Sequence, residues 1–379
     1  MSHKLIYYFT NLAPLYRESL WKKLLDENND FKLHIFSGKN LNLGIKEISD
    51  DFKASEEAKD RLHRIKNFWL FNKYLIWQSG ILNKLIRCPP DHVIFLGECY
   101  CLSTWIAAIY CRLKKIDVIF WGHGLYGNEK GLMLFFRKSF YKLSNKHLLY
   151  SERSKKLMIQ NGFNPDKLYI IYNSLNYEYQ KKLYESLSNY RFDFFHNPDK
   201  PVLIFIGRLI AEKKVDLLIK AAKALNAETH QVNLLIIGDG VMMNELTKTS
   251  QEGIDAGWIY FRGACYDELE LSKYLSSADL CASPGSIGLA AIHSLSFGTP
   301  VCTHDNFDDQ GPEFEAIIDN ENGFFFKEDD LESLTSKVEQ WIRKTKDKEF
   351  DYRKIIDFYY NPDYQQKVFE DTVKGNTST

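Results

Sequence analysis

The fold is decided by the stretch Val202-Leu-Ile-Phe-Ile-Gly-Arg-Leu-Ile-Ala-Glu-Lys-Lys214, which leads into a helical pattern over Val215–Leu225. Its first five residues are all apolar, as expected for a strand buried on both faces of a parallel sheet. The strand ends at Gly207, where the missing side chain allows another group to come close. Arg208 and Lys213 follow, and a forked guanidinium with an ammonium group is suited to a diphosphate. The alternative is that Arg208 pairs with a carboxylate and Lys213 lies on the surface.

Short apolar strands alternate with helical segments on both sides of this stretch, which predicts parallel sheets covered by helices. In the first half we expect strands at Leu5–Phe9, Lys32–Phe36, Val93–Leu96, Val118–Trp121, His147–Tyr150 and Leu168–Ile171. Between them we expect helices near Tyr16–Glu27, Phe68–Ile86, Leu102–Leu113, Leu132–Leu143 and Glu152–Asn161. In the second half the expected strands are Val202–Ile206, Asn233–Ile237, Ile259–Phe261, Leu280–Ala282, Pro300–Thr303 and Gly323–Phe326.

The predicted domains follow from this pattern. Residues 1–175 form a first Rossmann-like domain, 176–200 a polar linker and 201–345 a second doubly wound domain. Residues 346–379 are expected to form helices that pack back toward the first domain. The fold class is therefore α/β, with two Rossmann-like domains facing a central cleft, where the carboxyl ends of the strands bind ligands.

Charge and composition narrow the class of protein. Apolar residues make up 45% and charged residues 26%, as in ordinary globular proteins. Residues 1–175 hold 27 Lys and Arg against 16 Asp and Glu, whereas the remainder is acidic. The basic half fits an anionic partner such as lipid headgroups or a phosphorylated lipid acceptor, and no motif supports nucleic acid. The alternative is two solvated surfaces whose charge differs without functional meaning.

The compartment is inferred from cysteines and termini. Seven cysteines, none in a CxxC pair and most in apolar runs, indicate buried thiols in a reducing cytoplasm. The chain enters a strand at once, so we expect no signal peptide. The nearly uncharged run Val93–Cys111 is interrupted by Gly97-Glu98, and a strand followed by a helix explains it better than a membrane span.

A second motif, Ala282-Ser-Pro-Gly-Ser-Ile-Gly-Leu-Ala-Ala-Ile-His-Ser-Leu-Ser-Phe-Gly-Thr-Pro-Val301, predicts a strand, a glycine-rich turn and a helix from about Gly288 to Phe297. The backbone amides of Ser286, Ile287, Gly288 and Leu289 would then form an anion site at the start of that helix. The alternative is a tight turn that needs glycine only for packing. Two further strand ends, at Asp239 and Gly263, are expected to line the same edge, although Asp239 could simply cap a helix.

Taken together, these motifs resemble the donor-binding domain of retaining GT-B glycosyltransferases of family 4, the glycosyl transferases group 1 domain. The family's G-R-L-x-x-E-K-G segment matches Gly207–Lys214, its G-D-G turn Gly238–Gly240 and its G-T-P-V segment Gly298–Val301. The family's P-E-x-I…N-G segment resembles Pro312–Gly323, and its interdomain I-x-N-G resembles Ile171–Ser174. The resemblance covers residues 168–345 and implies retention of anomeric configuration, a nucleotide-sugar donor and Arg208 and Lys213 on its diphosphate.

One departure concerns two glutamates that the family usually carries eight positions apart, for the donor ribose and sugar. The corresponding positions here are Gly285 and His293, and neither is acidic. We hypothesise that Glu313 or Glu315 supplies a carboxylate to the same pocket.

In the first half, Val118-Ile-Phe-Trp-Gly-His-Gly-Leu-Tyr-Gly127 ends a strand with a histidine between glycines. The resemblance implies that His123 lies near the donor sugar and the acceptor, although a lone histidine is more often structural. Glu98 is a weaker candidate for acceptor contact. Tyr16 and Arg17 stand where the family has a glycine-rich loop near the phosphates.

The sequence therefore predicts transfer of a hexose-type sugar from a nucleotide diphosphate, UDP favoured over GDP, to a glycan or lipid-linked acceptor in surface polysaccharide or glycolipid synthesis. No D-x-D motif is present, and Asp50-Asp51 and Asp329-Asp330 are expected on the surface, so we expect no metal. The alternatives are a catalytically silent donor-binding protein and a nucleotide-sugar epimerase. The basic and aromatic segment Leu132–Lys156 either contacts anionic lipid or turns its aromatic residues to the core.

Overall fold

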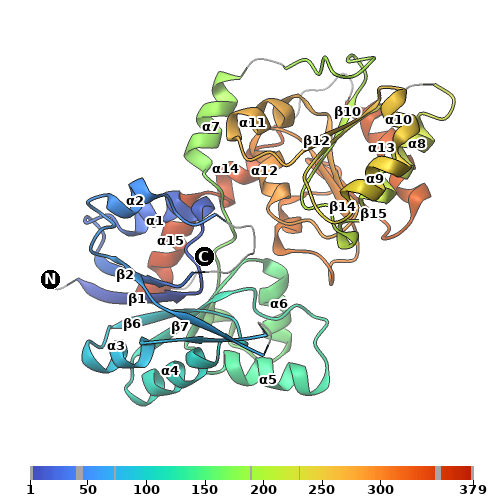
Figure 1. Cartoon of the computed structure of the whole chain (residues 1–379). Coiled ribbons are helices and arrows are strands. Elements are labelled where there is room, and N and C mark those ends of the chain that lie inside the picture. Colours follow the sequence, from blue (N-terminus) through green and yellow to red (C-terminus); the bar gives the residue numbers. More distant parts are fainter. Residues whose placement is uncertain are drawn as a thin grey trace. The chain divides into compact units, whose positions relative to one another are not determined.

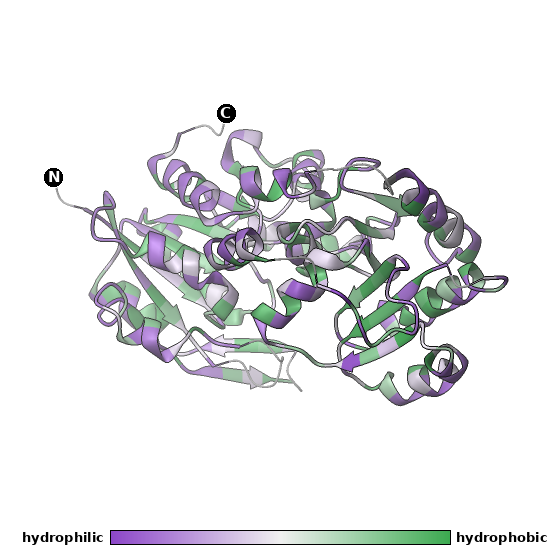
Figure 2. Ribbon diagram, turned by 90° about the horizontal axis from the view of Figure 1, so that it is seen from above, coloured by the Kyte–Doolittle hydropathy of each residue, from purple (hydrophilic) through white to green (hydrophobic). Residues whose placement is uncertain are grey.

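The computed structural model describes residues 3–39, 46–71, 74–187, 190–229, 231–345 and 351–376. The chain divides into two compact units: unit 1 is residues 1–176 with 361–379, and unit 2 is residues 177–360. Each unit is built on a parallel sheet covered by helices (Figure 1), which confirms the predicted doubly wound α/β class. Many strands of both units are hydrophobic along much of their length (Figure 2).

Unit 1 contains a seven-stranded parallel sheet in the order β3-β2-β1-β6-β7-β8-β9 and a separate β4–β5 hairpin. Its strands are β1 (Lys4–Thr10), β2 (Phe31–Ser37), β3 (Leu62–Arg64), β4 (Asn67–Leu70), β5 (Leu75–Gln78), β6 (His92–Leu96), β7 (Asp117–Gly122), β8 (Lys146–Leu149) and β9 (Leu168–Ile170). Its helices are η1 (Leu15–Arg17), α1 (Glu18–Leu24), α2 (Asp50–Ala54), α3 (Ile81–Arg87), α4 (Leu102–Leu113), α5 (Gly131–Tyr141), α6 (Glu152–Gln160), η2 (Pro165–Lys167) and α15 (Pro362–Lys374).

The alternation of side chains along β1 builds the two cores of unit 1. Ile6 and Tyr8 face the layer that contains α1 and α15. Tyr7 and Phe9 face the layer that contains α3, α4 and α5. Both layers are visible on either side of the sheet in Figure 1.

Unit 2 has a six-stranded parallel sheet in the order β12-β11-β10-β13-β14-β15. Its strands are β10 (Val202–Ile206), β11 (Asn233–Ile237), β12 (Ile259–Gly263), β13 (Leu280–Ser283), β14 (Val301–His304) and β15 (Gly323–Phe326). Its helices are α7 (Tyr177–Ser186), η3 (Ala211–Lys213), α8 (Val215–Leu225), α9 (Met243–Thr249), α10 (Gln251–Asp255), α11 (Glu268–Ser277), α12 (Ala290–Ser296), η4 (Pro312–Ala316), α13 (Leu331–Thr345) and α14 (Lys354–Tyr359).

One predicted helix is wrong. Most of Phe68–Gln78 forms the antiparallel β4–β5 hairpin, in which Phe68 pairs with Trp77, and only Ile81–Arg87 is helical. Residues 72–73, within the predicted helix, lie outside the described part. The aromatic and β-branched residues of this segment favour pairing between strands, and Gly80, at a φ of 82°, separates the hairpin from the helix.

The segments at the unit boundaries have defined structure. The expected linker 176–200 begins with α7, which packs against α11 and α12, while residues 188–189 lie outside the described part. Of the expected C-terminal helices, α15 buries Val368, Phe369 and Val373 in the core of unit 1. In contrast, α14 packs on α12 and belongs to unit 2, and residues 346–350 are not among those described.

Candidate functional site

The candidate site of unit 2 lies where the strand order of its sheet reverses, between β10 and β13. In open parallel sheets the crevice for ligands forms at the carboxyl ends of the strands at this point. Arg208 follows β10 and is exposed, and the glycine-rich turn 284–289 follows β13. The two motifs predicted to hold phosphate are therefore neighbours in space.

Lys213 joins the two motifs directly. Its Nζ donates a hydrogen bond to the carbonyl of Ser286, and its own carbonyl accepts a 3.1 Å bond from the amide of Gly285. Burial lowers the pKa of Lys213, the nearby charge of Arg208 lowers it further, and the charge of Glu313 opposes both. The positive charges of Arg208 and Lys213 therefore repel one another beside the turn 284–289.

Gly285 explains why the family's first glutamate position carries no acid here. A Cβ at this position would lie 2.0 Å from the carbonyl oxygen of Glu212 and 2.7 Å from the Cα of Lys213. No side chain fits without moving that backbone. The close approach that holds Lys213 against the turn therefore excludes a carboxylate at 285.

A buried polar network holds the turn 284–289 in place through hydrogen bonds. Gln310 accepts a 2.8 Å hydrogen bond from the amide of Ile287 and donates one of 2.8 Å to the hydroxyl of Thr303. That hydroxyl donates to the carbonyl of Ser283 at 2.9 Å. The amide of Ile287 is thus already occupied, contrary to the expected row of free amides, and α12 begins at Ala290, not at Gly288. Sequence reasoning missed Gln310, because no local pattern marks a glutamine that bonds to a backbone 23 residues away.

Glu313 is one of the two acidic residues that we expect to replace the missing acid of the family pattern. It is buried, and a Cβ on Gly311 would lie 3.0 Å from its Oε2 and 2.6 Å from the carbonyl oxygen of Ile287. The Glu313 carboxylate therefore lies beside the turn, and its charge acts on Lys213. Glu315 is two residues on in η4 and half-buried.

Three adjacent strand ends complete this edge. A Cβ on Gly238 would lie 1.8 Å from the carbonyl oxygen of Gly207, so the close backbone approach expected at Gly207 is present. Asp239 is exposed, and its Oδ1 accepts a 2.7 Å hydrogen bond from the amide of Gly240. Gly263 has open space where a side chain would be.

His293 makes a different contact from the one predicted. Its Nε2 lies 3.0 Å from Oε1 of Glu268, which also accepts a 2.8 Å bond from Gln180. Burial alone would raise the pKa of Glu268, but the hydrogen bonds from His293 and Gln180 lower it. The imidazole thus ties α12 to α11 and α7, and its role in donor binding stays a prediction.

The carboxyl edge of the unit 1 sheet carries the remaining candidates. His123 follows β7 and packs on the rings of Tyr126 and Tyr150, at centroid distances of 5.4 and 5.0 Å. Burial, with the charges of Arg17 and Arg137, lowers the pKa of His123 to about 4. The imidazole is therefore neutral at neutral pH. One of its ring nitrogens can donate a hydrogen bond, and the other can accept one.

Arg17 is buried, and its place near the phosphates stays a prediction. Its Nη2 donates to the hydroxyl of Tyr150 at 2.5 Å and to Oδ1 of Asn173 at 2.9 Å. The guanidinium also lies 5.1 Å from the Trp121 ring and 5.7 Å from that of the half-buried Tyr16. These bonds join the ends of β1, β7, β8 and β9.

Glu98 lies on the same edge, together with Glu129, for which the sequence did not suggest a role. Burial raises the pKa of Glu98 to about 7, although the charge of Arg137 opposes this. The buried Glu129 accepts hydrogen bonds from the amides of Tyr126 and Gly127, at 2.9 and 2.8 Å, and its carboxylate is 3.2 Å from Arg137. These interactions of Glu129 fix the loop that follows His123.

Comparison with known proteins agrees with this geometry. Residues 188–355 match the family model described as glycosyl transferases group 1. The matched residues all lie within unit 2 and make up most of it. An uncharacterized glycosyltransferase of Methanocaldococcus jannaschii is 30% identical over 141 residues, which are 36% of this chain and 36% of that protein. The chain thus spans about a third of the length of that curated relative.

The fold of the whole chain is also shared with solved glycosyltransferases. The lipopolysaccharide outer core galactosyltransferase WaaB has a TM-score of 0.70 at 15% identity, covering 98% of this chain and 99% of that one. Anabaena HepE in complex with UDP has a TM-score of 0.66 at 15% identity, covering 98% and 99%. The predicted GT-B fold is therefore confirmed.

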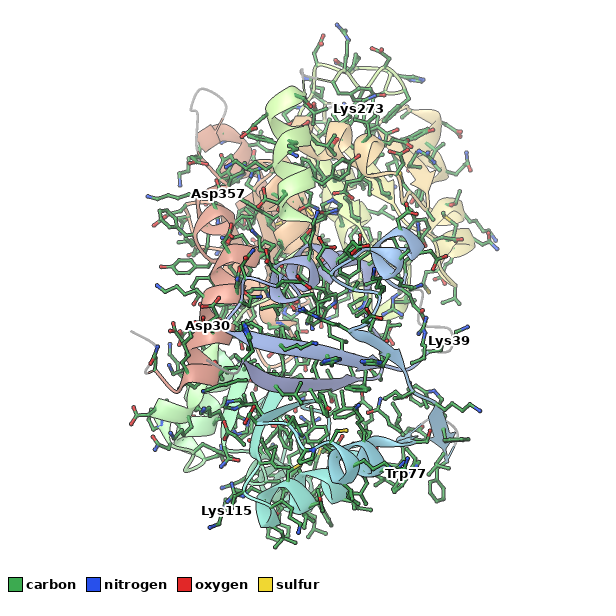
Figure 3. The ribbon with its side chains drawn as sticks, turned by 90° about the vertical axis from the view of Figure 1, so that its left-hand side faces the viewer. Asp30, Lys39, Trp77, Lys115, Lys273 and Asp357 are labelled. Carbon is green, nitrogen blue, oxygen red and sulfur yellow. The ribbon has the colours of Figure 1, made fainter. Side chains whose placement is uncertain are left out.

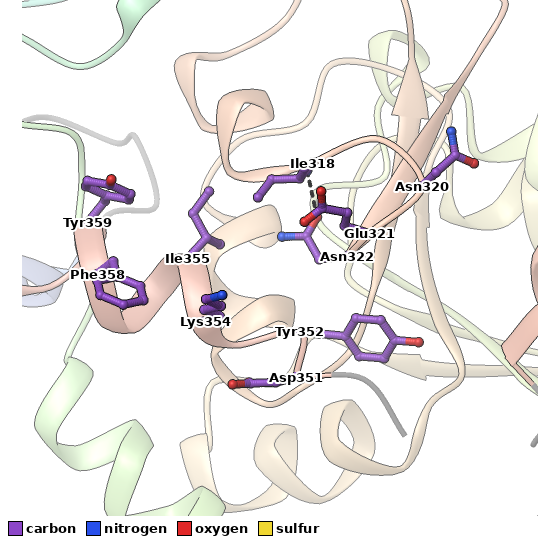
Figure 4. Close-up of a pocket in the computed structure, with 10 residues that line it drawn as sticks. All are labelled: Ile318, Asn320, Glu321, Asn322, Asp351, Tyr352, Lys354, Ile355, Phe358 and Tyr359. Atoms are coloured by element: carbon purple, nitrogen blue, oxygen red, sulfur yellow. Dashed lines mark hydrogen bonds between the residues drawn. The ribbon is translucent and has the colours of Figure 1, made fainter. Parts of the chain in front are cut away.

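A pocket of about 480 Å³ is formed by the loop 318–322 before β15 and by the segment around α14 (Figure 4). Within it the amide of Ile318 donates a 2.7 Å hydrogen bond to Asn322. Because this loop precedes β15, the pocket lies at the amino end of the sheet, opposite Arg208. Among the described residues, no helix is long and apolar enough to cross a membrane, and no group of three His, Cys, Asp or Glu could hold a metal ion.

Proposed function

We propose that the protein is a retaining glycosyltransferase that moves a hexose-type sugar from a nucleotide diphosphate donor to a glycan or lipid-linked acceptor. The observation that carries the proposal is the placement of Arg208 and Lys213 beside the turn 284–289 in a glycosyl transferases group 1 domain. Retention rests on the family resemblance. UDP is favoured over GDP, and the similarity in fold to HepE, solved with UDP, supports that choice.

In this proposal the chain's own cations supply the main electrostatic contribution. The leaving nucleotide diphosphate gains negative charge as the bond to the sugar breaks, and fixed positive groups stabilise that charge without reorganising. Arg208, exposed at the end of β10, offers two parallel donors, and Lys213 offers a point charge held against the turn. Glu313 would take the place of the absent acid, and His123 would contact the sugar or the acceptor.

The acceptor and the location are also part of the proposal. Surface polysaccharide or glycolipid synthesis is supported by the similarity in fold to a lipopolysaccharide galactosyltransferase. All seven cysteines are free thiols, which fits a reducing cytoplasm, and a lipid-linked acceptor would place the protein at the inner face of the membrane.

A thermal-shift screen of UDP, GDP, ADP and CDP, followed by nucleotide release from a panel of nucleotide sugars with and without acceptor glycans, tests the proposal. We expect UDP to raise the melting temperature most and release to depend on acceptor. No stabilisation by any nucleotide would contradict the proposal.

The second candidate is a catalytically silent nucleotide-sugar-binding protein, which the exclusion of an acid at Gly285 favours. It would show binding without release in any acceptor mixture. An epimerase would instead convert the donor sugar with no acceptor present, so the three outcomes are distinct.

A further inference from the structure

Helix α4 of unit 1 has larger apolar side chains on its outer face than on its inner face. The core side presents the small residues Ser103, Thr104, Ala107, Ala108 and Cys111, all buried. The outer side presents Ile106, Ile109 and Leu113, which are 47%, 46% and 78% exposed. These three are spaced by three and four residues and so form one stripe, the reverse of the usual pattern of a surface helix.

Neighbouring helices extend this stripe. The first turns of α5 expose Leu132, Met133, Phe135 and Phe136, each at 59% or more. Trp105 of α4 lies 5.1 Å from Phe140 of α5, between ring centroids, so the two helices are in contact. On the other side α3 packs on α4 and exposes Leu82 and Ile86.

The β4–β5 hairpin continues the same surface. The amide of Ile76 donates to the carbonyl of Tyr100 at 3.0 Å, and the amide of Gln78 donates to Ser103, which anchors β5 beside the start of α4. Trp77 and Lys115 are labelled on the part of unit 1 that α4 occupies in Figure 3. At the hairpin end, Phe71 and Tyr74 are 76% and 78% exposed.

The charge of these segments has one sign. Residues 67–87, 102–115 and 130–142 together contain ten Lys and Arg and no Asp or Glu. Arg137 is paired with Glu129. The exposed Arg87, Arg112, Lys114, Lys115, Lys130 and Lys142 form no ion pair with the residues that the structure describes. A broad apolar surface with unpaired cations is complementary to a partner that has an apolar interior and an anionic surface.

We propose that this surface, the apolar face of α3, α4, α5 and the β4–β5 hairpin, docks on an anionic lipid bilayer. The apolar side chains enter the acyl boundary, and the lysines and arginines contact the headgroups. Within the basic and aromatic segment Leu132–Lys156, Phe135 and Phe136 are exposed, whereas Phe140 and Tyr141 are in the core. The docking is independent of the proposed reaction, since a silent donor-binding protein could dock in the same way.

Co-sedimentation of the full chain with vesicles of phosphatidylcholine alone, or with phosphatidylserine added, tests the proposal. We expect binding to the anionic vesicles, weakened by salt, and about tenfold weaker binding for the double variants Ile109→Gln/Phe136→Gln and Lys114→Gln/Lys142→Gln. The matched control Leu269→Gln/Lys248→Gln changes an exposed apolar and an exposed basic residue of unit 2 and should bind like the unaltered chain.

An unchanged melting temperature and an unchanged circular dichroism spectrum would establish that the variants are folded. Equal binding of the unaltered chain and the unit 1 variants would overturn the proposal, as would binding to neutral vesicles as strong as to anionic ones. A lipid-free dimer that the Ile109→Gln/Phe136→Gln variant abolishes would assign the face to a second copy of the chain instead. Vesicle binding does not depend on nucleotide binding. Failure of the docking proposal and failure of the proposed function can therefore be told apart.

Discussion

Arg208 and Lys213 are the residues on which the proposed chemistry depends most. Replacing either by alanine should lower turnover about 10²–10³-fold, because each removes a fixed cation from the leaving diphosphate. The matched control is Lys214→Ala, since the Lys214 ammonium is paired with Glu328 and Asp329 at 2.9 and 2.7 Å. Steady-state kinetics with the preferred donor measures the effect. A loss in Lys214→Ala as large as in Lys213→Ala would contradict the assignment.

Gly285 allows a comparison between two glycines of the same turn. Gly285→Ala should destabilise the protein by about 1–3 kcal/mol, because its Cβ would meet the backbone of Glu212. Gly288→Ala should leave stability within about 1 kcal/mol, since nothing lies within 4 Å of its Cβ. Urea unfolding of both variants provides the measurement, and equal stability would show that the turn does not pack as described.

Glu313 is expected to replace the acid that the family carries at the turn. Glu313→Gln should weaken donor binding or turnover by about 10–100-fold, as for a hydrogen bond that involves a charged group. Glu315→Gln is the comparison from the same short helix, and we expect a smaller effect because only Glu313 is buried. Unchanged donor titration and kinetics in both variants would refute the hypothesis.

At the scale of elements, the loop between β7 and α5 is held by one carboxylate. Glu129→Gln removes one of two acceptors for the amides of Tyr126 and Gly127 and should release the loop that carries His123. We expect kcat to fall about tenfold and stability to fall by about 1–3 kcal/mol, with the KM for donor unchanged. Glu152→Gln, at an exposed position in the same unit, is the control. A changed donor KM with normal kcat would argue against the role of this loop in transfer.

Elements predicted from short-range patterns agree best with the structure. The bounds of α4, β10, β11 and β15 are those expected, since apolar runs between glycine or polar residues define them locally. The β4–β5 hairpin differs from the predicted helix, because a dense apolar and aromatic segment has no clear period. Its pairing with the backbone of Tyr100, which gives it a place beside α4, is a long-range contact.

At the scale of the whole molecule, we propose that the reaction needs no metal. We expect EDTA to leave the rate of nucleotide release unchanged, because Arg208 and Lys213 supply the positive charge that a divalent ion would otherwise provide. Release measured in EDTA, and again after adding Mg²⁺ or Mn²⁺, checks this. A rate that EDTA abolishes and Mn²⁺ restores would require a metal that the chain's cations do not replace.

The sequence by itself determined the doubly wound class, the strand that ends at Gly207 and the basic residues that follow it, because residue spacing and turn chemistry are local properties. Only the tertiary structure decided which groups meet: Gly285 against the backbone of Glu212, Gln310 on the amide of Ile287, and Glu313 beside the turn. It also decided that the large apolar residues of α4 face outward, since helical periodicity marks a stripe but not the side that a sheet covers. These contacts join residues distant in sequence, and folding alone brings them together.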